Sequence, residues 1–143
     1  NVTIRRLSGG LPDKWRRRGF YGKEQEMDIR YFGQNARLSE AVVAGGFVFL
    51  SGMVPENTEA DVKGQTQDVL AQIDRWLEKC GSDKAHILEA TVFLADMDGY
   101  AAMNEAWDEW VAAGRAPARA CVQAGLADSR WAVEIKVSAV QAV

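Results

Sequence analysis

An arginine and a glutamate lie on the last two β-type segments of the chain, PARACVQAG and WAVEIKVSAV. Because side chains alternate between the two faces of a strand, Arg119, Cys121 and Gln123 share the polar face of the first segment. Glu134 lies on the polar face of the second segment, and the apolar faces of both would turn toward a core. A guanidinium and a carboxylate on one surface form either a cross-strand ion pair or the two ends of a candidate site.

The distance between these groups depends on how the two segments pair. In a hairpin with a four-residue loop at 126–129, Glu134 lies opposite Cys121 and diagonal to Arg119, about 7–8 Å away. A shorter overlap of the strands would separate the two charges further. The sequence does not select between these registers.

Other catalytic chemistries lack the residues they need. His86 is the single histidine, which excludes paired-histidine metal sites and most nucleophile–histidine arrangements within one chain. Cys80 and Cys121 show no CxxC spacing and are expected to be reduced thiols of a cytoplasmic protein. Neither a GxxxxGK[ST] nor a GxGxxG motif is present to hold a phosphate or a dinucleotide.

The elements that must position Arg119 and Glu134 follow from hydrophobic periodicity. We expect strands at 28–32, 41–44, 47–52, 87–94, 118–125 and 131–140, with Gly45-Gly46 turning a hairpin. Two amphipathic helices are expected, one from Val62 to Cys80 that is capped by Gly81, and one that begins at the N-cap Asp98 and stops at Gly114. This order predicts an α+β fold in which both helices cover one face of a mostly antiparallel sheet. The other face either lies open to water or is covered, and self-association is the usual way to cover it.

Charge divides the chain at Met27. Residues 1–26 carry seven Lys/Arg against three Asp/Glu, whereas residues 27–143 carry ten against 17, a net charge of −7. We interpret 1–26 as a basic extension that is either poorly ordered or a start-site artefact, that docks on the domain, or that tethers it to RNA or an anionic membrane. It has no apolar core of a signal peptide, and the apolar run 41–50 is about half as long as a membrane span.

Five segments, in this order and spacing, resemble the RidA (YjgF) family of imine/enamine deaminases over about residues 37–139. They are AVVAGGFVFLSG, QTQDVLAQIDRWLEKCG, TVFLADMDGYAAMNEAW, PARACV and VEIKVSAV. The resemblance implies a chorismate-mutase-like α+β fold for 27–143, assembled as a homotrimer with clefts between subunits. It also implies hydrolysis of reactive 2-imino acids to 2-keto acids and ammonia, with no metal and no cofactor.

The resemblance assigns roles to particular residues. Arg119 in PAR would hold the substrate carboxylate, and Glu134 in VEI would position and deprotonate the attacking water. Cys121 would line the site through its backbone. Ser51 and Gly52 in LSG would close over the substrate from the neighbouring chain, and Asn104 in MNEAW would form part of the wall.

Two positions depart from the family pattern. Leu38 stands where well-characterised members have a tyrosine near the substrate, and Met53 stands where they have a glutamine after Ser-Gly. Both changes replace a hydrogen-bonding group by an aliphatic one. We expect them to favour imines with larger apolar side chains or to lower the rate.

Two other functions stay open at this point. The first is a non-catalytic module that uses the same arginine to bind a small carboxylate. The second is an RNA-binding or RNA-cleaving protein, for which the acidic domain is a poor partner and only the basic residues of 1–26 could supply phosphate contacts.

Overall fold

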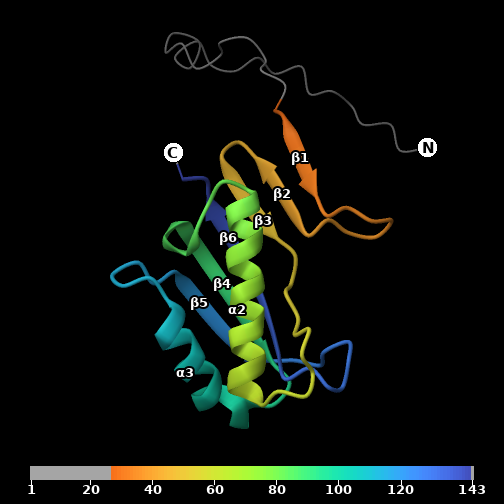
Figure 1. Cartoon of the computed structure of the whole chain (residues 1–143), viewed down its shortest axis with the longest axis vertical. Helices are drawn as coiled ribbons and strands as arrows, with labels where there is room; N and C mark the ends of the chain where they lie inside the picture. Colours follow the sequence, from red (N-terminus) through yellow and green to blue (C-terminus); the bar gives the residue numbers. More distant parts are fainter. Residues whose placement is uncertain (1–26, 143) are drawn as a thin grey trace, which may run out of the picture.

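The computed structural model describes residues 27–142, which form a six-stranded sheet with two helices on one face (Figure 1). The basic segment predicted at 1–26 lies outside the described residues. The strands are β1 (Ile29–Phe32), β2 (Ala41–Ala44), β3 (Phe47–Leu50), β4 (Ile87–Leu94), β5 (Ala118–Gln123) and β6 (Val133–Val140). The helices are α2 (Val62–Lys79) and α3 (Tyr100–Trp110), and short 3-10 turns, η1 (Lys84–His86) and η2 (Met97–Gly99), precede β4 and α3.

The sheet order is β1-β2-β3-β6-β4-β5, and every neighbouring pair is antiparallel except β4 and β5. β2 and β3 form the predicted hairpin. Gly45 and Gly46 occupy its turn with φ of 58° and 82°, a conformation that side chains other than glycine rarely adopt. The predicted α+β architecture is therefore confirmed, with a single parallel pair at one edge.

α2 packs its apolar stripe on the sheet, whose strands supply most of the buried core residues. The Asp61 side chain caps the helix by accepting a hydrogen bond from the Gly64 N–H at 2.8 Å. Both helices lie side by side on the same face of the sheet (Figure 1). The fully buried residues beneath them include Val69, Leu70, Ile73, Leu77, Val92, Leu94, Met103, Val133 and Ile135.

The second helix differs from its prediction at both ends. Asp98 lies in the turn η2, and Asp96 caps that turn by accepting from the Asp98 N–H at 2.8 Å. α3 itself begins after Gly99 without a side-chain cap and ends at Trp110, because Val111 adopts an extended ψ of 138°. The prediction that Gly114 stops the helix is therefore wrong.

The predicted hairpin of the last two strands is also wrong. β5 pairs parallel to β4, and β6 lies between β3 and β4, so β5 and β6 are not neighbours. The reason is the α3 crossover, which returns the chain alongside β4 in the same direction. The apolar residues of β5 (Ala118, Ala120 and Val122) consequently lie on the open face of the sheet, and its polar residues turn toward the helices.

The open face exposes several large apolar side chains. Strand pairing places Ile29, Tyr31, Phe47, Phe49 and Val122 on it, and each is about half exposed, from 45% to 55%.

Within residues 27–142, no helix has the length and apolar character needed to cross a membrane.

Candidate active site

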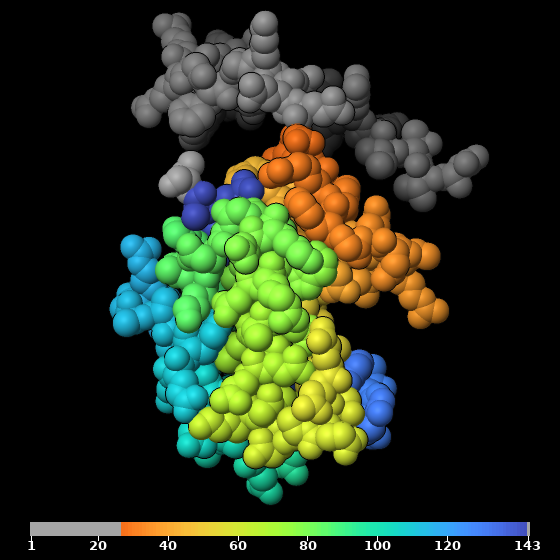
Figure 2. Space-filling model, in the orientation of Figure 1, coloured from red at the N-terminus to blue at the C-terminus, as the bar shows by residue number. Residues whose placement is uncertain are grey.

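A pocket of about 310 Å³ lies where the loop after β3 meets the start of β6. Five residues predicted from the sequence line it: Leu38, Ser51, Gly52, Met53 and Glu134. The other lining residues are Glu40, Val54, Gln72, Ala127 and Trp131. In Figure 2 the surface is hollowed between the orange residues that precede β2 and the yellow and blue loops, which is where these residues come together.

Glu134 reaches this pocket because Gly52 has no side chain. Gly52 belongs to the segment that continues past β3 beside β6, where Met53 and Ile135 exchange backbone hydrogen bonds of 2.8 and 3.0 Å. A Cβ on Gly52 would overlap Oε1 of Glu134 and lie 3.0 Å from its Cδ. The Glu134 carboxylate therefore lies directly against the backbone of Gly52, in the space that a side chain there would fill.

Glu40 is a second carboxylate in the pocket, and it is bound to Ser51. The Ser51 hydroxyl donates a hydrogen bond of 2.7 Å to Oε2 of Glu40, and the Ser51 N–H donates to the Glu40 carbonyl at 2.9 Å. Two contacts thus fix the pair in one arrangement. Glu40 was not predicted from the sequence, although it lies two residues after Leu38, the spacing at which side chains of an extended segment share a face.

Two buried glutamines on the apolar stripe of α2 hold the segments that line the pocket. Gln72 donates from Nε2 to the Val54 carbonyl at 2.8 Å and to Oδ1 of Asp68 at 3.2 Å. Oδ2 of Asp68 in turn accepts from the backbone N–H groups of Glu56 and Asn57 at 2.7 and 2.9 Å. These contacts tie the 54–57 segment to the helix. A glutamine that interrupts an apolar stripe is the signal that could have identified Gln72.

Gln65 anchors the loop that brings Ala127 and Trp131 to the pocket. It is 3% exposed; its Nε2 donates to the carbonyls of Thr58, Ala60 and Arg130, and its Oε1 accepts from the Ala132 N–H at 2.7 Å.

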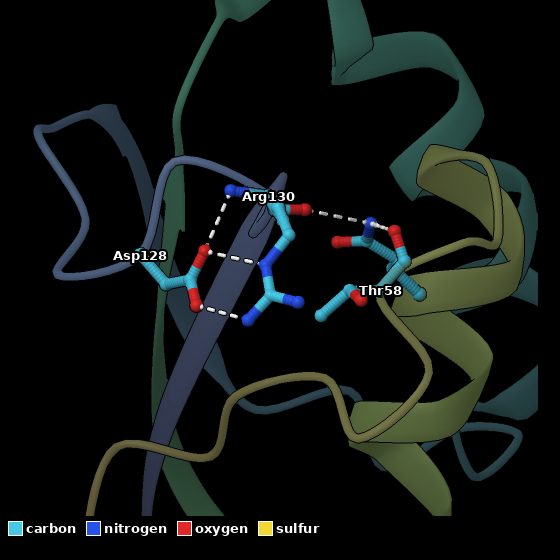
Figure 3. A network of polar contacts seen from close by, with 4 residues as sticks. Thr58, Asp128 and Arg130 are labelled. Atoms are coloured by element: carbon cyan, nitrogen blue, oxygen red, sulfur yellow. Dashed lines mark hydrogen bonds and ion pairs between the residues drawn. The ribbon is translucent and has the colours of Figure 1, made fainter.

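Arg130 and Asp128 fix the same loop from its outer side. Arg130 holds Asp128 through Nε at 3.1 Å and Nη2 at 2.7 Å, and this guanidinium, together with the Arg130 N–H, lowers the pKa of Asp128 to about 2 (Figure 3).

Arg119 lies away from this pocket, on the other face of the sheet. It pairs with Ala90 of β4 on the helix side, whereas Glu134 pairs with Phe93 on the open side. The guanidinium lies over the Trp107 ring, 4.9 Å from its centroid, and donates to the Met103 sulfur at 3.8 Å. From strand spacings the two backbones are about 14 Å apart. The prediction that Arg119 and Glu134 share a face of one chain is therefore wrong.

Asn104 and Cys121 both belong to the helix-covered side of the sheet, where Arg119 lies. Asn104 is half-buried on α3. Cys121 packs against the core beside the helices, where burial raises the pKa of its thiol although the Arg119 charge opposes this shift. A raised pKa keeps the thiol protonated at neutral pH, so Cys121 is a poor nucleophile.

Leu38 and Met53 differ in what they offer to the pocket. Leu38 is 47% exposed and presents its side chain at the pocket, whereas Met53 is 3% exposed because it packs in the core.

Within residues 27–142, no group of three or more His, Cys, Asp and Glu side chains is arranged to hold a metal ion.

Comparison with known proteins identifies relatives over this whole domain. The family model described as Endoribonuclease L-PSP matches residues 30–141. The RutC family protein YoaB of Escherichia coli K12 is 51% identical over 113 residues, which are 79% of this chain and 98% of YoaB.

Solved structures give the same result. The crystal structure of NMB1025 from Neisseria meningitidis, a member of the YjgF family, is 65% identical with a TM-score of 0.80, and the match covers 82% of this chain and 98% of that one. Yeast Mmf1 is 26% identical with a TM-score of 0.70, over 76% of this chain and 90% of Mmf1. The resemblance found in the sequence is confirmed, and the chain belongs to the RidA (YjgF) family.

Proposed function

We propose that the protein hydrolyses reactive 2-imino acids to 2-keto acids and ammonia. The observation that carries this proposal is the Glu134 carboxylate, which lies against Gly52 in a pocket that also holds Ser51. A carboxylate fixed in a small cavity can accept the proton of a water molecule as that water attacks an electrophilic carbon.

The reaction balances with water as the only co-substrate. Water oxygen bonds to the imine carbon while Glu134 takes one water proton and passes it to the nitrogen, so the C=N double bond becomes a single bond in a neutral carbinolamine. Glu134 then takes the hydroxyl proton of the carbinolamine and delivers it to the nitrogen as the C–N bond breaks. The electrons of the O–H bond form the carbonyl of the keto acid, ammonia leaves, and Glu134 is again a carboxylate.

Arg119 binds the substrate carboxylate, and it does so from a neighbouring protomer. Its fork of N–H donors matches a carboxylate. Because Arg119 and Glu134 lie on opposite faces of one sheet, a site that uses both requires two chains. The half-exposed apolar side chains of the open face support assembly, which we propose is a homotrimer with three shared sites.

The description of the family model names an endoribonuclease, and the pocket favours imine hydrolysis over that activity. Among the described residues 27–142, those that line it include two carboxylates and no Lys, Arg or His, and residues 27–143 carry a net charge of −7. An RNA backbone would be repelled at such a site. A small zwitterionic or monoanionic substrate that is anchored by one arginine would be accepted.

The decisive experiment mixes two inactive variants. Arg119→Ala supplies the Glu134 side of a site and Glu134→Gln supplies the Arg119 side. If chains of both kinds are unfolded, mixed in equal amounts and refolded as random cyclic trimers, one site in each mixed trimer is intact, so about 25% of wild-type activity returns. Imine is supplied by an amino-acid oxidase while semicarbazide competes for it, and sedimentation should give three times 15.7 kDa.

Controls separate the claims in this proposal. Arg115→Ala removes an exposed arginine close to β5 and should leave the rate unchanged. Imine turnover by each variant alone at the wild-type rate would refute the catalytic roles. Active wild type with no recovery in the mixture would refute the shared site. Carboxylate binding without any turnover would identify a binding module.

A further inference from the structure

The polar side chains of the pocket wall present hydrogen-bond acceptors. Ser51 has a single hydroxyl proton and donates it to Glu40, so only the lone pairs of its oxygen are left for a ligand. Gln72 uses both protons of its amide nitrogen on Val54 and Asp68, which leaves its carbonyl oxygen. Glu40 and Glu134 are carboxylates, and an ionised carboxylate can accept hydrogen bonds but cannot donate them.

The charge of the pocket wall and its aromatic residue also favour a positively charged ligand. Among the described residues that line the pocket, none is Lys, Arg or His, and the Trp131 indole N–H is the one side-chain donor that is not engaged by Glu40, Val54 or Asp68. The face of an aromatic ring attracts cations. The wall is therefore complementary to a positively charged group that carries N–H donors.

A 2-imino acid contains one group of this kind when its nitrogen is protonated. A neutral imine nitrogen carries one N–H and a lone pair, whereas the iminium carries two N–H donors and a positive charge. The keto product has only a carbonyl oxygen there, which is itself an acceptor and would meet the acceptors of the wall. The wall thus favours substrate over product.

We propose that the pocket binds the substrate nitrogen as an iminium cation, and that Glu40 is a positioning residue that holds Ser51 Oγ as an acceptor toward it. This inference rests on the proposed function, since it identifies the form of the substrate that the same site takes. Glu40 accepts the Ser51 proton through a charge-assisted hydrogen bond and so turns the lone pairs of Oγ into the pocket.

The test compares two stable probes, 2-aminobutanoate and 2-ketobutanoate, by calorimetry at pH 7 with the full chain. The probes share a carboxylate and a carbon skeleton, and they differ in an ammonium against a carbonyl. We expect wild type to bind the amino acid at least tenfold more tightly, on the order expected for a charge-assisted contact. Glu40→Gln and Ser51→Ala should each reduce that ratio severalfold, whereas Glu78→Gln, at an exposed position of α2, should not change it.

A second comparison asks whether Glu40 acts through Ser51. In a Ser51→Ala background, adding Glu40→Gln should change the ratio less than it does in wild type, because only the direct effect of the Glu40 charge is left. An undiminished Glu40→Gln effect in that background would overturn the positioning role. Equal or tighter binding of the keto acid by wild type would overturn the inference, whether or not imine is turned over. A preference for the amino acid in a protein without imine turnover would refute the deaminase and leave the preference of the pocket standing.

Discussion

Replacement of Gly52 by alanine tests directly whether the position of the Glu134 carboxylate matters. The new Cβ would overlap Oε1 and lie 3.0 Å from Cδ and 3.2 Å from Cγ of Glu134. Carbon atoms in contact are normally about 3.5–4.0 Å apart, so the carboxyl group must move by about 1 Å. A displacement of that size can cost about 100-fold in rate, which corresponds to about 2.7 kcal/mol of transition-state stabilisation.

Stability should not fall with the rate in this variant. Gly52 is not among the positive-φ glycines of the described chain, so alanine fits its backbone conformation. Alanine also lowers the entropy of the unfolded chain, which favours folding by a few tenths of a kcal/mol to about 1 kcal/mol. We therefore expect kcat in the semicarbazide assay to drop about 100-fold while Tm stays level or rises.

Gly125→Ala is the matched control, because a Cβ at Gly125 has no atom within 4 Å and its φ is not positive either. It should keep wild-type activity. Adding Glu134→Gln to Gly52→Ala should cost little more, since both changes remove the same carboxylate from its position. A folded Gly52→Ala variant with a rate within threefold of wild type would refute the reasoning.

Two predictions concern the loop that carries Ala127 and Trp131. Gln65→Leu leaves the Ala132 N–H and several carbonyls without their partner, so urea unfolding should show a loss of about 2–4 kcal/mol; a loss under about 1 kcal/mol would contradict this account. Asp128 has a pKa lowered from 3.8 to about 2 by the Arg130 side chain, so it stabilises the fold above pH 3.8 and loses this effect as the pH falls through about 2. The Tm difference between wild type and Asp128→Asn should therefore shrink as the pH falls from 3.8 to about 2, and a difference that stays constant over this range would argue against the ion pair.

Local signals in the sequence predicted the elements well where periodicity and turn chemistry agree. The strand Ile87–Leu94 has the predicted bounds, α2 ends one residue before its prediction, and the Gly45-Gly46 hairpin forms as expected. These features depend on interactions between residues that are close together in the sequence. The ends of α3 were missed because the turn η2 and the extended Val111 depend on how the helix joins the sheet.

Pairing of the last two strands could not be predicted from alternation. A period of two tells which side chains share a face, and it does not tell which face is inside. In β5 the small apolar residues Ala118 and Ala120 turned out to face outward, and Arg119 lies against Trp107. The family resemblance named Ser51, Gly52 and Glu134 as site residues, which strand spacing alone would not have done, but it put Ser51 and Gly52 on a neighbouring chain, whereas all three line one pocket of the same chain. Glu40 was missed because its importance comes from a contact between two separate segments, at 40 and 51.

The central position of β6 determines when the proposed site can form. β6 is the last of the described strands in chain order, yet it joins β1-β2-β3 on one side to β4-β5 on the other. Until it inserts, the two halves of the sheet expose unpaired edges, and these long-range pairings are the slow kind in folding. Glu134 is carried by that same strand. Closure of the sheet and arrival of the carboxylate in its pocket are thus one event, so the proposed site does not exist before β6 has inserted.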